Sequence, residues 1–231
     1  MKKHYLPAST GHTFTRRELL LLGIGASLLP SGLVAADTRR RLLQATPRQT
    51  AGPFYPNWSQ ADRDADLTRV AGRSESASGE LIQVSGRVLT PDNKPVEGVL
   101  IEIWQANAQG RYAHEADSNP APIDQNFQGW GQMTTDANGA YQFKTIIPGP
   151  YPVSRSWSRP PHIHFKLQKP GFSTLTTQMY FAGHPLNDVD ALLLQHGAEE
   201  RDQLIVAFDD RGVSNGSRPV RSGVFNIVLD A

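Results

Sequence analysis

Two tyrosines and two histidines in this chain have side chains that could bind one metal ion. His162 and His164 are separated by a single residue, and Tyr151 and Tyr112 precede them in the sequence. In a β-strand, side chains at i and i+2 leave on the same face. The two imidazoles can therefore converge on one ion while Ile163 points into the opposite layer.

A proline pair comes directly before the histidines. Pro160 and Pro161 each fix φ and lack a backbone N–H. This pattern predicts the end of a loop that enters an edge strand or a barrel strand.

Phenolate and imidazole donors favour ferric iron over other common metals. Phenolate is an anionic oxygen donor that stabilises the hard ferric ion, whereas zinc sites favour cysteine, histidine and carboxylates, and ferrous oxygenases use two histidines and a carboxylate. The chain contains no cysteine. Tyrosine, with a pKa of about 10, becomes phenolate at neutral pH only beside a strong cation, so ligation and deprotonation are one event. A zinc or copper enzyme that uses the histidines is an alternative.

Ordinary structural roles also exist for these residues. A His-x-His pair occurs in strands by chance, and tyrosines beside glycine and proline are commonly turn residues with a buried ring and a solvated hydroxyl. The surrounding sequence decides between these interpretations.

That surrounding sequence resembles the intradiol ring-cleavage dioxygenases. Within the family, the resemblance is greatest to the iron-binding catalytic subunit of the protocatechuate 3,4-dioxygenase branch. The similar segments follow the family's order from about residue 50 to residue 230, which is too long an extent for coincidence. They are Gly52–Pro56, Gly98–Tyr112, Phe127–Gly131, Thr135–Gly139, Pro148–Pro152, Arg159–Phe165 and Thr177–Phe181.

The resemblance implies a non-haem Fe(III) cofactor and a catechol-type substrate. The implied iron ligands are Tyr112, Tyr151, His162 and His164. The axial ligand, Tyr151, leaves the metal when the ortho-diphenol arrives and carries off one of its protons. O2 then inserts between the two hydroxylated carbons and gives a cis,cis-muconate-type dicarboxylic acid.

The resemblance also assigns catalytic roles to Arg159 and Gln178. The guanidinium of Arg159 would stabilise negative charge that develops on the substrate, and Gln178 would help to hold the substrate. Trp104 occupies the position of a pocket-lining tryptophan. The ordinary alternatives are a surface arginine, a strand glutamine and a core tryptophan.

The segment after Tyr151 departs from the protocatechuate branch. Val153 replaces a tryptophan, and the loop that leads to His162 is shorter. In that branch a second type of subunit completes the pocket. The natural diphenol therefore stays open, as does the choice between a homo-oligomer and a related partner subunit.

The N-terminal segment predicts a Tat-type signal peptide over residues 1–36. Arg16 and Arg17 form a twin arginine, an apolar stretch runs over Leu19–Leu29, and the small residues of Val34–Ala36 precede Asp37. We expect an exported protein, periplasmic or secreted. The apolar stretch is too short to span a bilayer comfortably, so no stable membrane insertion is expected.

The rest of the chain is long enough for one domain with a sizeable core. Residues 37–79 are polar and predict an arm and a long loop, and residues 80–231 predict the catalytic domain. The absence of cysteine in an exported protein indicates stabilisation by packing and metal rather than by disulfides. A formal net charge of +1 indicates no nucleic-acid partner.

Short strands between Gly, Pro and Asn turns predict an all-β fold, a β-sandwich of mostly antiparallel strands with long loops. Leu81–Leu89 and Val99–Trp104 flank the turn at Pro91–Pro95 and are expected to form a hairpin. One short helix is expected over Asp188–His196, with Asp188 or Asn187 as its cap. The other expected strands are Ala140–Ile146, His162–Gln168, Thr176–Phe181, Leu204–Phe208 and Gly223–Leu229.

A non-catalytic protein is the main alternative to an enzyme. The segments Val84–Val88 and Lys94–Val99 resemble transthyretin-like and carboxypeptidase-associated sandwich domains, which bind partners or act as spacers. Those domains lack the set of two tyrosines and two histidines. The purple or burgundy colour of an iron–phenolate centre would distinguish the enzyme from the module.

Overall fold

The structure is a computed structural model that describes residues 42–57, 62–154, 156–209 and 218–230. The predicted signal peptide and the first part of the arm lie outside the described residues. Within the described ranges, no helix combines the length and the apolar character needed to cross a membrane.

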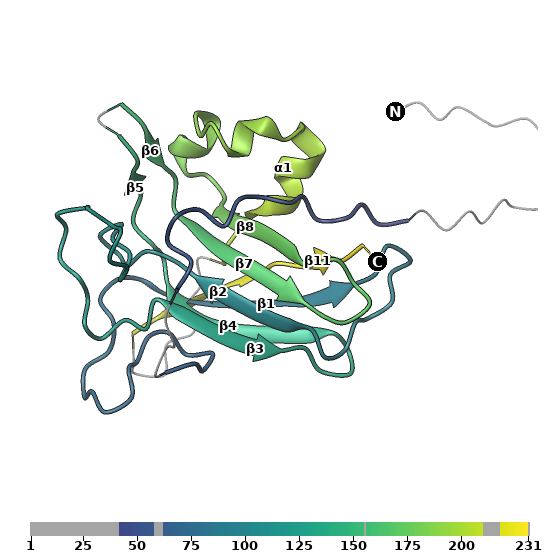
Figure 1. Cartoon of the computed structure of the whole chain (residues 1–231), viewed down its shortest axis with the longest axis horizontal. Coiled ribbons are helices and arrows are strands. Elements are labelled where there is room, and N and C mark those ends of the chain that lie inside the picture. The colour runs from purple at the N-terminus through teal and green to yellow at the C-terminus, as the bar shows by residue number, and fades with distance from the viewer. Residues whose placement is uncertain (1–41, 58–61, 155, 210–217, 231) are drawn as a thin grey trace, which may run out of the picture. The chain divides into compact units, whose positions relative to one another are not determined.

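Two β-sheets make up most of the described fold (Figure 1). In the four-stranded sheet, β1 pairs antiparallel with β4 and parallel with β10 and β11. In the five-stranded sheet, the order is β3-β2-β7-β8-β9, and only the β8–β9 pair is parallel. The bounds are β1 Leu81–Leu89, β2 Leu100–Trp104, β3 Trp130–Thr134, β4 Ala140–Ile146, β7 His162–Gln168, β8 Leu175–Phe181, β9 Ile205–Val206, β10 Val220–Val224 and β11 Ile227–Val228. The predicted all-β sandwich is confirmed.

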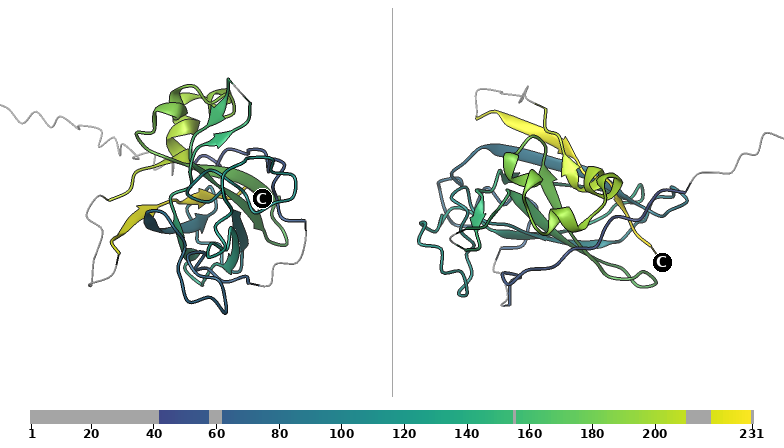
Figure 2. Two further views of the ribbon diagram at one scale, coloured as in Figure 1. Left: turned by 90° about the vertical axis from the view of Figure 1, so that its left-hand side faces the viewer. Right: turned by 90° about the horizontal axis from the view of Figure 1, so that it is seen from above.

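Smaller elements lie beside the five-stranded sheet. Strands β5 and β6 form a separate antiparallel ribbon. Figure 2 shows this ribbon next to the helical segment that follows β8. The bounds are β5 Tyr151–Pro152, β6 Ser158–Arg159, the 3-10 turns η1 Pro185–Asp188 and η2 Leu193–Gln195, and the helix α1 Ala198–Leu204.

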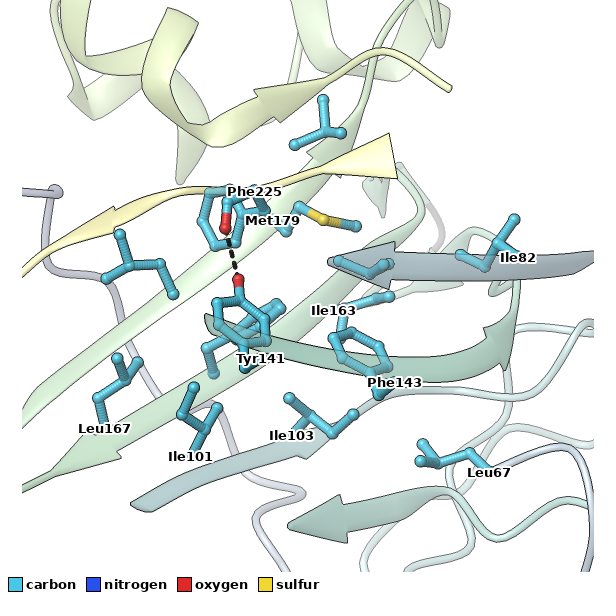
Figure 3. Close-up of a cluster of buried hydrophobic side chains, with 14 of the residues drawn as sticks. Leu67, Ile82, Ile101, Ile103, Tyr141, Phe143, Ile163, Leu167, Met179 and Phe225 are labelled. Carbon is cyan, nitrogen blue, oxygen red and sulfur yellow. Dashed lines mark hydrogen bonds between the residues drawn. The ribbon is translucent and has the colours of Figure 1, made fainter. Parts of the chain in front are cut away.

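Alternating side chains on the strands fill the core between the sheets (Figure 3). On β7, Ile163, Phe165 and Leu167 are fully buried in this core. Each such side chain contributes about 1.5–3 kcal/mol by leaving water. The hydroxyl of Tyr141 on β4 donates a hydrogen bond of 2.5 Å to the carbonyl of Phe225 across the same core.

The predicted hairpin of β1 and β2 is wrong. The turn itself forms, because the N–H of Val96 donates to the carbonyl of Val88 at 2.9 Å, but the chain then crosses to the other sheet. Ile101 and Ile103 on β2 are fully buried in the core that both sheets share. The two strands thus pack face to face, an arrangement that a hairpin in one sheet would not allow.

The predicted helix over Asp188–His196 is also wrong. This segment contains η2 and the end of η1, and α1 begins only at Ala198. His184 rather than Asp188 or Asn187 caps η1, since its Nδ1 accepts from the Leu186 N–H. The Asn187 side chain instead donates to the carbonyl of Phe181. The Asn187 side chain, one of the two expected caps, is therefore used in a hydrogen bond to β8 and not as a helix cap.

Three strand predictions need correction. β7 lies at the centre of its sheet and not at an edge, and this is possible because both prolines precede the strand and remove no N–H from it. The predicted strand Leu204–Phe208 is reduced to β9. The predicted strand Gly223–Leu229 is replaced by β10 and β11, because the Asn226 side chain accepts from the Arg87 N–H at the break. β3, β5 and β6 were not predicted.

Candidate metal centre

The outer face of the five-stranded sheet carries the candidate site. His164 on β7 lies between Trp104 on β2 and Gln178 on β8, and His162 pairs with Tyr180. The alternate residues of β7 point into the core, so all five of these side chains lie on the opposite face. The segment before β1 crosses this face, where the Gln49 N–H donates to the Thr176 carbonyl on β8 (Figure 1).

Three predicted ligand atoms converge on this face. The Oη of Tyr112 lies 3.3 Å from Nε2 of His162 and 3.2 Å from Nε2 of His164. All three side chains are at least 96% buried. Two ligands at about 2.1 Å from one ion are about 3 Å apart when the angle between them is near 90°. The spacing of these three donors therefore fits a shared ion.

The hydrogen bonds of His162 define which of its nitrogens is free to bind a metal. Its Nδ1 lies 2.7 Å from the carbonyl of Pro160, which can only accept, so Nδ1 carries the proton. Nε2 then presents a lone pair toward Tyr112. This arrangement matches metal-binding histidines generally, whose second nitrogen donates to a carbonyl or carboxylate.

Burial keeps both imidazoles neutral. Desolvation, followed by the positive charge of Arg159, lowers the pKa of His162 to about 3. Desolvation also lowers the pKa of His164 well below its usual value, with further lowering by His162 and Arg159. The ring of Trp104 stacks on His164 at 4.8 Å between centroids and 7° between planes. Neutral, sterically fixed imidazoles are the form that a metal cation requires.

Tyr112 is a buried phenol that needs a strong cation to ionise. Desolvation raises its pKa well above the usual value, and the charge of Arg159 opposes this only in part. Its ring stacks on Phe54 at 4.6 Å, and its backbone N–H donates to the carboxylate of Asp117 at 2.7 Å. The donor set of one buried phenol and two neutral imidazoles fits a highly charged ion such as Fe(III).

Tyr151 lies beside this cluster but is held less tightly. Its ring contacts Tyr112 edge to face at 5.7 Å and Phe54 at 5.2 Å. The side chain is partly exposed, and its hydroxyl makes no hydrogen bond with the described residues. Burial, followed by the nearby charge of Asp117, raises its pKa. The structure thus joins three predicted ligand atoms directly and places the ring of the fourth beside them.

A close contact between two glycines aligns the segments that carry the tyrosines. A Cβ on Gly110 would lie 2.1 Å from the carbonyl oxygen of Pro150, and one on Gly149 would lie 2.5 Å from the nitrogen of Gly110. Gly149 also donates to the carbonyl of Asn107 at 2.9 Å. Only residues without a side chain allow these two segments to approach so closely.

Gly110→Ala is therefore expected to destabilise the protein by about 3 kcal/mol or more, since overpacking adds to the strain of its positive φ of 78°. Gly171→Ala is a matched control, because Gly171 has a φ of 86° but no heavy atom within 4 Å of the added Cβ. It should lose only about 1–2 kcal/mol. Urea unfolding of both variants measures the difference, and equal losses would show that the contact is unimportant.

Arg159 is a buried residue of the site, and the alternative of a surface arginine is wrong. It is 5% exposed. Its Nε and Nη2 donate to the two carboxylate oxygens of Asp190 at 3.2 and 3.0 Å, and Nη2 also donates to the Tyr180 hydroxyl at 2.7 Å. Nη1 lies 3.2 Å from Nε2 of His162. The guanidinium is therefore fixed with one edge toward the candidate metal centre.

Gln178 is fully buried and links the N-terminal arm to the site. Its Nε2 donates to the carbonyl of Thr50 at 2.8 Å, and its Oε1 accepts from Tyr180 at 3.2 Å. Sequence reasoning missed Tyr180, Asp190 and the stacking role of Phe54. Phe54 and Tyr180 lie inside segments that carried the resemblance, which is a usable signal. Asp190 had no signal beyond its position in a supposed helix.

Acid is expected to destabilise the metal-free protein through these histidines. Between pH 6.5 and about 3, the unfolded state binds a proton at His162 that the native state does not, so stability falls as pH falls. At pH 4 this one residue accounts for a loss of roughly 3 kcal/mol relative to pH 7. Urea unfolding against pH should give a shallower dependence for His162→Asn than for wild type. Parallel curves for wild type and His162→Asn would contradict the expectation.

Comparison with known proteins gives the class. The chain matches the dioxygenase family model over residues 50–231. It is 46% identical over 165 residues to the protocatechuate 3,4-dioxygenase beta chain of Burkholderia cepacia, which covers 70% of each chain. It is 31% identical over 185 residues to catechol 1,2-dioxygenase 1 of Acinetobacter lwoffii, which covers 73% of this chain and 58% of that one.

Comparison with solved structures indicates the same class of protein. The dioxygenase domain of a dioxygenase carbohydrate-binding protein fusion from Streptomyces sp. SirexAA-E superposes with a TM-score of 0.59 and 33% identity, covering 81% of this chain and 99% of that one. The fold and the matches together define an oxidoreductase of the dioxygenase class. More narrowly, the chain belongs to the intradiol ring-cleavage dioxygenase family. The predicted family and enzyme class are confirmed, and a non-catalytic sandwich module is not favoured.

Proposed function

We propose that this protein is a non-haem Fe(III) enzyme that uses O2 to open the ring of an ortho-diphenol between its hydroxylated carbons. The product is a cis,cis-muconate-type dicarboxylic acid. The observation that carries the proposal is the convergence of Tyr112 Oη with Nε2 of His162 and of His164 in a chain of this family. Those three residues and Tyr151 would hold the iron. Bound ferric iron supplies the Lewis acidity that favours the ionised diphenol and activates its ring toward O2.

Tyr151 is the proposed base for the incoming diphenol. Tyr151 is partly exposed, whereas the other three proposed ligands are buried. Its hydroxyl makes no hydrogen bond with other described residues, whereas Tyr112 is held by Phe54 and by both histidines. Tyr151 can therefore move without breaking the rest of the site. Its Oη would then accept a proton from a substrate hydroxyl.

Arg159 is the proposed stabiliser of negative charge on the substrate. Asp190 and Tyr180 occupy the hydrogens on its Nε and Nη2, so only the two hydrogens of Nη1 face the site. When the Nε2 lone pair of His162 is committed to a metal, both of these hydrogens are available to substrate oxygen. Gln178 has one further Nε2 hydrogen that can help to hold the substrate.

The natural diphenol and the oligomeric state are proposed from separate observations. Val153, which directly follows β5, is 41% exposed, and the protocatechuate branch has a larger residue at this position. We therefore propose an ortho-diphenol with a substituent other than the protocatechuate carboxylate.

The relative from B. cepacia is named a beta chain, which suggests a related partner subunit, with a homo-oligomer as the alternative. Gel filtration of the purified chain with light scattering distinguishes these.

We also propose export through the Tat pathway, on the basis of the twin arginine at Arg16 and Arg17. Replacement of both residues by lysine should retain the protein in the cytoplasm. Equal export of the variant and the wild type would contradict this route.

We propose that residues 37–79 form the arm with its loop and that residues 80–231 form the catalytic domain.

The proposed reaction is tested with the iron-loaded protein and a panel of catechol, protocatechuate, hydroxyquinol and larger alkyl or aryl diphenols. We expect one O2 consumed per ring opened and both atoms of 18O2 in the dicarboxylic product. A tightly bound zinc or copper with no O2 uptake on any diphenol would instead support the other metalloenzyme class.

A further inference from the structure

The carboxylate of Asp190 is a buried charge that the proposed reaction leaves without a role. It lies between η1 and η2, outside the sheet that carries the site, and is fully buried. An ionised carboxylate in such a place is costly unless it is paired and hydrogen-bonded. Its partner is Arg159, which lies on β6 of the separate β5–β6 ribbon.

We propose that Asp190 is a positioning residue that fixes the plane and the direction of the Arg159 guanidinium in the catalytic site. This inference rests on the proposed function, because Arg159 is the residue through which Asp190 acts. Asp190 itself touches neither the proposed metal ligands nor the proposed substrate.

The geometry of the pair fixes the orientation of the guanidinium. Both carboxylate oxygens of Asp190 accept from different nitrogens of Arg159, Oδ1 from Nε and Oδ2 from Nη2. A two-point contact between two planar groups defines an orientation, which a single hydrogen bond does not. The Tyr180 hydroxyl accepts the second Nη2 hydrogen, so Nη1 alone is directed toward His162.

Asp190 is itself held in place by backbone hydrogen bonds. Its Oδ2 accepts from the Leu193 N–H at 3.1 Å, and its carbonyl accepts from the Leu194 N–H at 3.0 Å. Tyr180 is held in turn by Gln49 at 2.8 Å. The positions of both partners of Arg159 are thus set by other elements, and the arginine takes its orientation from them.

Asp190 also balances the charge of Arg159 beside the candidate metal centre. A permanent cation 3.2 Å from a proposed ligand nitrogen would repel a metal cation at the same site. Asp190 makes the buried pair neutral overall. The site can then contain both a guanidinium that donates to the substrate and a metal ion.

The test compares Asp190→Asn, which keeps the shape but removes the charge, with Asp190→Glu and with the control Asp188→Asn. Asp188 is exposed on η1 and lies two residues away. With the iron-loaded enzyme, we expect Asp190→Asn to lower kcat for the preferred diphenol by about tenfold to a hundredfold, with KM changed less than threefold. Asp190→Glu should recover part of kcat, and Asp188→Asn should match wild type.

A second readout needs neither iron nor turnover. In the metal-free full chain, the Arg159 Nε–H should give an NMR signal that is protected from exchange with water, and this protection should be lost in Asp190→Asn but kept in Asp188→Asn. Wild-type protein without a protected Arg159 Nε–H would overturn the proposal even if Asp190→Asn failed to fold. A folded Asp190→Asn with wild-type kcat would overturn it too.

The two readouts also separate this proposal from the proposed function. If wild type opens no diphenol ring but its Arg159 Nε–H is protected, the reaction assignment fails and the orientation of Arg159 by Asp190 holds. If wild type opens the ring but the Nε–H exchanges freely, only the role of Asp190 fails.

Discussion

Tyr112→Phe is expected to abolish the visible absorption band of the iron-loaded protein and to lower diphenol turnover by at least about 100-fold. The substitution removes the one phenol oxygen that lies within 3.3 Å of both histidine nitrogens and leaves the ring stacked on Phe54. Without that oxygen the site is expected to lose its iron, and with the iron the phenolate band to which Tyr112 and Tyr151 would both contribute. His162→Ala is expected to have the same effect, because it removes a ligand nitrogen. Absorption spectra and O2 uptake measure both consequences.

The matched control is Tyr141→Phe, which removes another buried tyrosine hydroxyl from the opposite sheet. Its hydroxyl donates to the carbonyl of Phe225, so the variant should lose about 1–2 kcal/mol of stability but keep its colour and turnover. A Tyr112→Phe protein with wild-type colour and turnover would remove Tyr112 from the ligand set.

Arg159→Met is expected to lower kcat by about 10²–10³-fold, as the loss of a donor to developing negative charge generally does. It should also lower the free energy of unfolding by about 3–5 kcal/mol, because Asp190 is left buried without a counter-charge. Arg87→Met, an exposed arginine on β1, should change stability by less than about 0.5 kcal/mol.

The double variant Arg159→Met/Asp190→Leu separates the two effects. Removal of both charges should restore most of the stability, since a buried ion pair replaced by apolar residues is commonly neutral or stabilising. Turnover should stay as low as in the single variant. Recovery of turnover together with stability would show that Arg159 has only a structural role.

Local sequence signals located the metal-binding candidates because their chemistry depends on short spacings. His162 and His164 share a face whatever their strand pairs with, and Ile163 enters the core as the same periodicity requires. Tyr112 lies in the long segment between β2 and β3, and its contact with the histidines of β7 became predictable only through the family resemblance. In the structure, the close contact between Gly110 and Gly149 places Tyr151 beside the cluster.

Those local signals do not predict which strands or side chains pair over a long separation in the sequence. The turn after β1 was recognised, yet no local pattern tells whether the next strand pairs with β1 or packs against it from the other sheet. Asp190 fell inside the predicted helix Asp188–His196, for which Asp188 or Asn187 was the expected cap. Its actual partner, Arg159, is distant in the sequence, and only the folded structure brings the two together.

The most direct measurement is a crystal structure of the iron-loaded protein with anomalous diffraction recorded on both sides of the iron absorption edge. We expect one iron peak per chain within about 2.3 Å of Tyr112 Oη, Tyr151 Oη and Nε2 of His162 and His164. An iron peak elsewhere, or a different metal at these residues in an active preparation, would contradict it.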